Sequence, residues 1–289
     1  MPTFSHIRMQ NTVTTAKGPA RRAIAVITAV LLMSVTSACG GRSGDGIILA
    51  GSTSVEPYAE VLSEDYALLH PDEEVDVQGG GSAAGITAAE SGVADIGMSS
   101  RNLKDDEKKA LWSVEIAKDG LAVIVNPKNP LRGLTTQQVR DIYSRKITGW
   151  GEVGGDEAKI NVITREDGSG TRSSFESFIM GPDRITPKAI VQDSNGAVRQ
   201  LVCDDPNSIG FISLGLVDQT VKALILDDIE PTRENVINRS YGLFRPFLFL
   251  TKGEPAGLAK QFIDYTLSPE GQKILMNEGL IPSAEGTRS

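Results

Sequence analysis

The sequence predicts an α/β fold, and three observations support this prediction. Short apolar runs that are typical of buried strands alternate along the chain with segments that have helical periodicity. Three of these runs end in turns rich in Gly and Ser or Thr that lead into a helix, as in largely parallel sheets. The 289 residues, of which 40% are hydrophobic, are enough for two domains of about 100 to 150 residues each.

The N-terminal part of the chain has the pattern of an export signal. Basic residues, Lys17 among them, precede an apolar run at 23–35, and small residues follow this run up to Cys39. The run is too short to span a bilayer, which needs about 20 apolar residues. We therefore expect residues 1–38 to be removed as a signal peptide.

The charge balance argues against a nucleic-acid-binding protein. Residues 1–38 contain four basic and no acidic residues, so their removal leaves 25 basic against 37 acidic residues and changes the formal net charge from −8 to −12. Nucleic-acid binding depends on clustered Lys and Arg side chains. No nucleic acid is therefore expected as a partner.

The first predicted strand–helix unit begins with an apolar strand at 47–50. The turn 51–54, Gly-Ser-Thr-Ser, leads from this strand into a helix that starts near Pro57. The apolar face of this helix is expected to contain Tyr58, Val61, Leu62, Tyr66 and Leu69.

The same arrangement is predicted twice more along the chain. A strand at 75–77 precedes Gly-Gly-Gly-Ser at 79–82 and an Ala-rich helix, and a strand at 160–164 precedes the turn 165–171 and a further helix. The N-terminus of a helix has unpaired backbone N–H groups and a partial positive charge, which favour anions. Each hydroxyl taken alone fits an N-cap, but three such turns at the carboxyl ends of strands predict an anion site.

Three further strands are predicted from apolar runs at 94–98, 121–125 and 246–250, and a helix follows the last of them near 257–267. The two cysteines do not predict a disulfide framework. Cys39 ends a Thr-Ser-Ala-Cys segment that resembles a bacterial lipobox, with Thr in place of the usual aliphatic residue, and is expected to be lipidated. On this interpretation Cys203 is a packed thiol on a helix.

Several segments together resemble the signature segments of one protein family. They are GSTSVEP at 51–57, GGGSAAG at 79–85, DIGMSSR at 95–101, LTTQQVRDIYSRKITGW at 134–150, REDGSGTR at 165–172 and SNGAV at 194–198. In their order and spacing they are similar to those of periplasmic phosphate-binding proteins, the substrate-binding lipoproteins of phosphate ABC transporters. The resemblance extends over most of the chain from about Ile47 to Pro282.

The resemblance implies a type II periplasmic-binding-protein-like α/β fold with two lobes. Two crossing strands would form the hinge, and the ligand would lie in the interlobe cleft. After the export signal and a lipidated tether at 39–45, lobe 1 would contain residues 46–120 and 241–289, and lobe 2 would contain residues 121–240.

The resemblance also implies a function without enzymatic activity. The protein would capture inorganic phosphate outside the cytoplasm, in the periplasm or on the outer face of the cytoplasmic membrane, as a monomer with a lipid anchor in the cell membrane. It would deliver phosphate to the permease subunits of an ABC importer. No metal or organic cofactor is expected.

The residues that would bind phosphate follow from the matching motif positions. Arg165 would be the charged clamp, oriented by Asp167, and the turns would contribute hydroxyl and backbone donors. The full expected set is Thr53, Ser54, Ser82, Ser99, Ser100, Arg101, Arg165, Ser169, Gly170 and Thr171.

One position of the expected site departs from part of the family. Members that reject sulfate through an acceptor carboxylate have Asp where this chain has Ser100. A carboxylate accepts the proton of hydrogen phosphate and repels fully ionised sulfate. Glu56 and Asp193 are candidates for a substitute acceptor. Binding of another oxyanion, such as sulfate, molybdate or a phosphonate, stays open as the alternative.

Two functions of other classes fit the sequence less well. A secreted phosphoester hydrolase of the Ser-His-acid type would depend on His70, which lies in a polar turn, because His6 falls in the signal. The sequence also lacks a Gly-x-Ser-x-Gly elbow, a Walker lysine motif and a Cys/His metal cluster. A surface interaction lipoprotein, the other alternative, would not predict a convergent anion site.

Overall fold

The structure, a computed structural model, describes residues 45–283 of the chain. The predicted signal peptide at 1–38, the predicted lipidation site Cys39 and the tether up to residue 44 lie outside the described residues. Between residues 45 and 283, no helix combines the length and the apolar character needed to cross a membrane.

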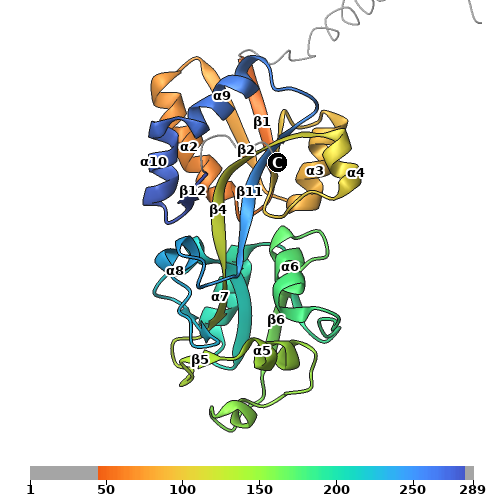
Figure 1. Cartoon of the computed structure of the whole chain (residues 1–289), viewed down its shortest axis with the longest axis vertical. Coiled ribbons are helices and arrows are strands. Elements are labelled where there is room, and N and C mark those ends of the chain that lie inside the picture. The colour runs from red at the N-terminus through yellow and green to blue at the C-terminus, as the bar shows by residue number, and fades with distance from the viewer. Residues whose placement is uncertain (1–44, 284–289) are drawn as a thin grey trace, which may run out of the picture. The chain divides into compact units, whose positions relative to one another are not determined.

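The first of two lobes, called lobe 1, is formed by elements from both ends of the described chain (Figure 1). Its core packs strand residues such as Leu49 and Ile96 against helix residues such as Phe262. Its elements are β1 (Asp45–Gly51), α2 (Glu56–Leu69), β2 (Glu73–Gln78), α3 (Ser82–Ser91), β3 (Ile96–Ser99), α4 (Asp105–Ala110), α9 (Gly257–Leu267), α10 (Pro269–Asn277) and β12 (Ile281–Pro282).

The second lobe, called lobe 2, is formed by elements from the middle of the chain (Figure 1). In its core, the rings of Phe175 and Phe211 stack with centroids 4.0 Å apart, and Tyr241 also packs here. Its strands are β5 (Gly133–Leu134), β6 (Asn161–Arg165), β7 (Ile190–Gln192), β8 (Ser208–Ser213), β9 (Lys222–Ala223) and β10 (Ile225–Leu226). Its helical segments are α5 (Thr136–Tyr143), η1 (Trp150–Val153), α6 (Gly170–Phe175), η2 (Glu176–Met180), α7 (Asn195–Asp204), η3 (Leu214–Leu216) and α8 (Arg233–Ile237).

Two antiparallel strands, β4 (Trp112–Val125) and β11 (Phe244–Thr251), run between the lobes (Figure 1). They occupy the middle of the strand order β2-β1-β3-β11-β4-β8-β6-β7. β4 pairs with β11 up to Gly120 and with β8 from Leu121 onward. The strand predicted at 121–125 is thus only the second half of β4, because the more polar first half contains no continuous apolar run.

Parallel pairing brings the predicted hydroxyl-rich turns together within each lobe. In lobe 1, β1 is parallel to both β2 and β3, so the turns after these three strands lie at one edge of the sheet. In lobe 2, β6 is parallel to both β7 and β8. Helices α2, α3, α6 and α7 begin at these turns. The predicted α/β fold class with two lobes and two crossing strands is confirmed.

Two predicted helices differ from the structure in detail. In α2, Tyr58, Leu62 and Tyr66 are buried as expected, but Leu69 is 62% exposed because it is the last residue of the helix. The helix expected after the turn 165–171 is short: α6 ends at Phe175 and continues as the π-helical turn η2.

Candidate functional site

Four buried serine side chains of lobe 1 form one side of a polar cluster. Ser52 and Ser54 follow β1, Ser82 begins α3, and Ser100 follows β3. Ser52 Oγ donates to Ser100 Oγ at 2.9 Å, and Ser82 Oγ lies 3.3 Å from the same oxygen. Ser82 Oγ also accepts from the backbone N–H of Ser100 at 3.0 Å. The expected residues Ser54, Ser82 and Ser100 are thus brought together.

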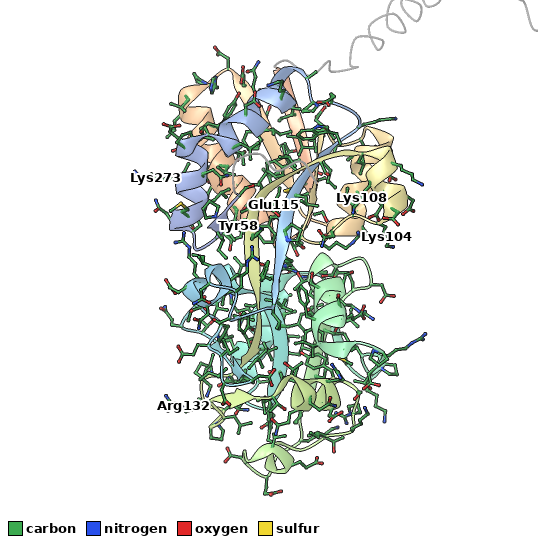
Figure 2. All side chains as sticks on the ribbon, viewed as in Figure 1. Tyr58, Lys104, Lys108, Glu115, Arg132 and Lys273 are labelled. Atoms are coloured by element: carbon green, nitrogen blue, oxygen red, sulfur yellow. The ribbon has the colours of Figure 1, made fainter. Side chains whose placement is uncertain are left out.

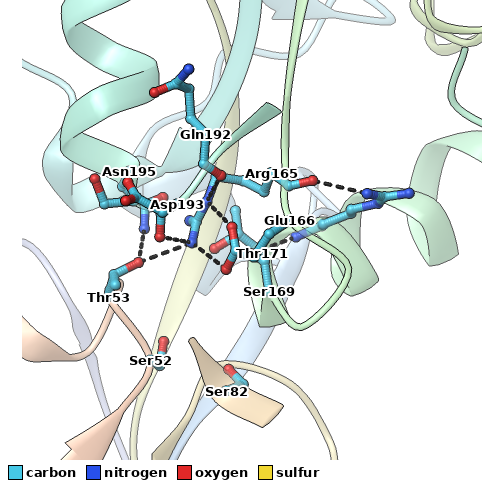
Figure 3. A network of polar contacts seen from close by, with 12 residues as sticks. Ser52, Thr53, Ser82, Arg165, Glu166, Ser169, Thr171, Gln192, Asp193 and Asn195 are labelled. Atoms are coloured by element: carbon cyan, nitrogen blue, oxygen red, sulfur yellow. Dashed lines mark hydrogen bonds and ion pairs between the residues drawn. The ribbon is translucent and has the colours of Figure 1, made fainter. Parts of the chain in front are cut away.

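The first residues of α6 form the opposite side of this cluster (Figure 3). Ser169 is the N-cap of α6, and its Oγ accepts from the N–H of Arg172 at 3.2 Å. Gly170 lies directly against lobe 1, because a Cβ atom added there would be 2.3 Å from Ser82 Oγ and 2.5 Å from Ser100 Oγ. The backbone can approach this closely only without a side chain.

Hydrogen bonds join the two lobes at the cluster. Ser54 Oγ in lobe 1 lies 2.8 Å from Thr171 Oγ1 in lobe 2. Close by, the N–H of Ala83 donates to the carbonyl oxygen of Gly168 at 3.1 Å. The structure therefore shows the lobes in contact, with the hydroxyl groups between them.

Arg165 is the cation of this cluster, and its residue is only 1% exposed. Its Nη2 donates to Thr53 Oγ1 in lobe 1 at 3.1 Å and to the backbone carbonyl of Asp193 in lobe 2 at 2.8 Å (Figure 3). The remaining terminal nitrogen, Nη1, is buried and has no hydrogen-bond partner within residues 45–283. Arg165 therefore has a donor available for an anion.

The carboxylate that holds Arg165 is Glu166, so the expected pairing with Asp167 is wrong. Glu166 accepts from Arg165 Nε at 3.0 Å and from Nη2 at 2.9 Å. The side chain of Asp167 is 94% exposed and pairs with Arg172 at 2.7 Å. The turn directs Asp167 toward solvent, away from the buried guanidinium.

Two expected residues, Ser99 and Arg101, have their side chains outside the cluster. Ser99 Oγ donates to the carbonyl of Arg101 at 3.0 Å and accepts from its N–H at 3.3 Å, so it shapes the turn after β3. The Arg101 guanidinium makes two hydrogen bonds of 2.8 Å to Glu107. These bonds hold the pKa of Glu107 below its usual range. The structure gives Arg101 a local structural partner instead of a place beside Arg165.

Three buried residues that sequence reasoning missed belong to the cluster or support it. Asn195 Nδ2 donates to Ser54 Oγ at 2.9 Å. Arg245 Nη2 donates to the same oxygen at 3.0 Å and forms an ion pair with Asp119 at 3.1 Å. The SNGAV segment was a signal for Asn195, and a charged residue beside the apolar run of β11 was the signal for Arg245.

Neither candidate for a substitute acceptor carboxylate contacts Ser100 through a hydrogen bond in the described part of the chain. Glu56 lines a pocket of about 290 Å³ together with Thr53 and Asn195. Burial, followed by the charge of Glu60, raises the pKa of Glu56. Asp193 is exposed, and it is its backbone carbonyl that binds Arg165.

The arrangement suits a small oxyanion. It combines buried hydroxyl groups, backbone amides at helix starts and a buried guanidinium with an unpaired donor. Within residues 45–283, no group of three or more His, Cys, Asp or Glu side chains is placed to hold a metal ion.

The chain is similar to known proteins over most of its length. The family model of the PBP superfamily domain matches residues 17–270. The phosphate-binding protein PstS of Bacillus subtilis (strain 168) is 33% identical over 253 residues, which are 85% of this chain and 84% of the relative.

Two solved structures are similar over the whole of their own chains. A putative phosphate ABC transporter substrate-binding protein from Clostridium perfringens, with bound phosphate, is 44% identical with a TM-score of 0.80, and the match covers 83% of this chain and 100% of that chain. An ABC-type phosphate transport receptor from Vibrio cholerae is 42% identical with a TM-score of 0.69, over 82% and 100% of the two chains.

Proposed function

Since the chain belongs to the phosphate-binding proteins of the PBP superfamily, we propose that it captures inorganic phosphate and delivers it to an ABC importer. The match extends over the full length of the solved phosphate-transport proteins. This coverage supports the same function for the whole of this chain, and not only for one of its domains. The protein is a binding component and performs no covalent chemistry on its ligand.

The observation that carries this proposal is the buried cluster of donors between the two lobes. Arg165 Nη1 supplies a charged donor, and the hydroxyl and amide groups around it supply neutral ones. Together they replace the hydration of the anion. The residues that bind phosphate are Thr53, Ser54, Ser82, Ser100, Arg165, Ser169, Gly170 and Thr171.

Phosphate binding also controls the relative position of the lobes. The binding residues come from both lobes, so the anion stabilises the closed form more than any open form. The proposed lobes are close to residues 46–120 with 241–289 and residues 121–240. One boundary lies within β4, and the other is placed at the start of β11, because Tyr241 packs in the core of lobe 2. The closed, loaded protein is the form that the permease subunits receive.

The protein acts outside the cytoplasm, attached to the membrane. Residues 1–38 are the signal peptide, and Cys39 becomes the lipidated first residue of the mature protein. The tether at 39–45 separates the lipid from lobe 1. The mature protein acts as a monomer.

A competition titration tests the proposed ligand. Phosphate is titrated calorimetrically into the purified protein alone and in the presence of sulfate or molybdate. Phosphate is expected to bind one to one and to be displaced by the other oxyanions only at large excess. Tighter binding of sulfate or molybdate would assign the same site to a different oxyanion and overturn the phosphate proposal.

A further inference from the structure

A buried ion pair joins the two crossing strands beside the cluster. Asp119 of β4 and Arg245 of β11 are directly opposite each other in the antiparallel pairing. Arg245 Nε and Nη2 donate to Asp119 Oδ2 at 3.2 and 3.1 Å, and Ser213 Oγ donates to Asp119 Oδ1 at 2.8 Å. Asp119 is 1% exposed and Arg245 is 2% exposed. The pair is therefore fixed and removed from water.

A buried ion pair often adds nothing to the stability of a fold. Removing two charges from water costs several kcal/mol per ion, and replacing both partners with apolar side chains is often neutral or stabilising. Burial raises the pKa of Asp119 and lowers that of Arg245, which reflects this cost. A role other than stability is the simpler reason for two charges at this position.

The hydrogen bonds of Ser54 show what Arg245 does. Ser54 Oγ accepts from Arg245 Nη2 and from Asn195 Nδ2, and both nitrogens can only donate. The amide of Asn195 is oriented because its Oδ1 accepts from the N–H of Ser213 at 3.2 Å. The hydrogen of Ser54 must then point to Thr171 Oγ1, 2.8 Å away. Thr171 in turn has its own hydroxyl hydrogen free to donate to an anion.

Arg245 also brings a second positive charge close to Arg165. The charge of Arg165 contributes to the lowered pKa of Arg245, after the larger effect of burial. Like Arg165, Arg245 has a buried Nη1 without a hydrogen-bond partner in the described part of the chain. Two buried guanidinium groups, each with an unused donor, are thus present at one cluster.

We propose that Arg245, anchored by Asp119, is a second cationic residue of the phosphate site. Through Ser54, it orients the Thr171 hydroxyl for donation to the ligand, and it adds a positive charge beside Arg165 from the strands that connect the lobes. This inference rests on the proposed function, because it assigns a further residue to the same phosphate site.

The test replaces the pair by apolar residues, Asp119→Leu with Arg245→Met, which removes the charges without leaving either one unpaired. Calorimetry is expected to show phosphate affinity reduced about 10- to 100-fold, the loss expected for a hydrogen bond from a charged group. The melting temperature of the phosphate-free protein is expected to stay near or above that of the wild type. Unchanged phosphate affinity in this double variant would overturn the inference.

Asp119→Asn separates a binding role from a structural one and also serves if the double variant does not fold. The amide oxygen of Asn can still accept from Arg245 and hold it in place, while the negative charge that offsets its positive charge is removed. This variant is therefore expected to bind phosphate at least as tightly as the wild type. A weakened affinity in Asp119→Asn would assign the pair a structural role and overturn the inference. The control, Arg101→Met with Glu107→Gln, removes a comparable ion pair outside the cluster and is expected to leave the affinity unchanged.

The wild-type titration keeps the two proposals apart. If the wild type binds phosphate and Asp119→Leu/Arg245→Met binds it equally tightly, only the proposed role of Arg245 is contradicted. If the wild type binds no phosphate, both the proposed function and this inference are contradicted.

Discussion

At the scale of single residues, Ser100 bears most directly on the discrimination between phosphate and sulfate. Its hydroxyl oxygen accepts from Ser52 and lies next to Ser82, and its backbone N–H donates to Ser82. It therefore lies inside the cluster. A hydroxyl can accept a hydrogen bond from the OH group of hydrogen phosphate without repelling sulfate.

Ser100→Asp is expected to sharpen the rejection of sulfate. The new carboxylate accepts the proton of hydrogen phosphate but repels an anion that has none, so the ratio of sulfate to phosphate dissociation constants should rise at least about tenfold. Competition calorimetry measures this ratio, with Ser100→Asn as the uncharged control. An unchanged ratio would show that Ser100 does not face the ligand.

The sequence predicted some residues of the cluster and not others. Ser82 and Arg165 follow recognisable turns, and both are found in the cluster. Arg245 is 191 positions from its partner Ser54, and no local pattern connects them. Arg101 stands next to Ser100 in sequence, yet a favourable carboxylate on α4 directs it elsewhere. The position of Arg101 next to Ser100 in the sequence does not show that Glu107 binds its guanidinium group.

At the scale of elements, the close approach of α6 to lobe 1 depends on Gly170. A Cβ atom at this position meets atoms of Ser82 and Ser100 that belong to the opposite lobe. The clash arises only when the lobes are closed, because Gly170 belongs to lobe 2 and both contacted residues belong to lobe 1.

Gly170→Ala is therefore expected to weaken phosphate binding without unfolding the protein. Overpacking of about 1 to 3 kcal/mol in the closed form corresponds to a loss of roughly 5- to 150-fold in affinity. Calorimetry and thermal melting of the phosphate-free protein measure the two effects. Gly196→Ala, where an added Cβ has only Ser194 Oγ at 4.0 Å, is the matched control. Binding as tight as in the wild type would contradict the close approach of α6.

The start of α4 provides a test of pH dependence. Hydrogen bonds from Arg101 hold the pKa of Glu107 below its ordinary value of 4.5. A carboxylate with a lowered pKa stabilises the folded state above the unfolded pKa, and this contribution is lost as the pH falls through the folded pKa.

Glu107→Gln should therefore reduce the free energy of unfolding at neutral pH, and the difference from the wild type should shrink as the pH falls below about 4.5. Urea unfolding at a series of pH values measures the difference. If the difference between the two proteins did not change with pH, the ion pair with Arg101 would not stabilise the fold. Phosphate affinity at neutral pH should be the same in both proteins.

The prediction of elements from sequence was accurate where a continuous apolar run marked the element. The strand at 47–50 and the helix at 257–267 correspond to β1 and α9. The first half of β4 was missed, since polar residues such as Asp119 interrupt its pattern. Its pairing with β11 comes from residues more than 100 positions away, which no local pattern can show.

At the scale of the whole molecule, an acidic protein presents a local positive site to an anion. The formal charge without residues 1–38 is −12. Within residues 45–283, the cluster contains two buried guanidinium groups, and the carboxylates bonded to them are Glu166 and Asp119. Glu166 is partly exposed and its charge is screened by solvent. The cluster can therefore attract a dianion even though the rest of the surface repels it.

The most direct test of phosphate capture at this cluster is calorimetric titration of phosphate into the wild type and into Arg165→Ala. The wild type should bind one phosphate per chain. Removal of one partner of a buried charge pair costs on the order of 3 to 5 kcal/mol, so Arg165→Ala should bind at least about a hundredfold more weakly while keeping its fold. If Arg165→Ala bound phosphate as tightly as the wild type, phosphate would have to bind elsewhere on the protein.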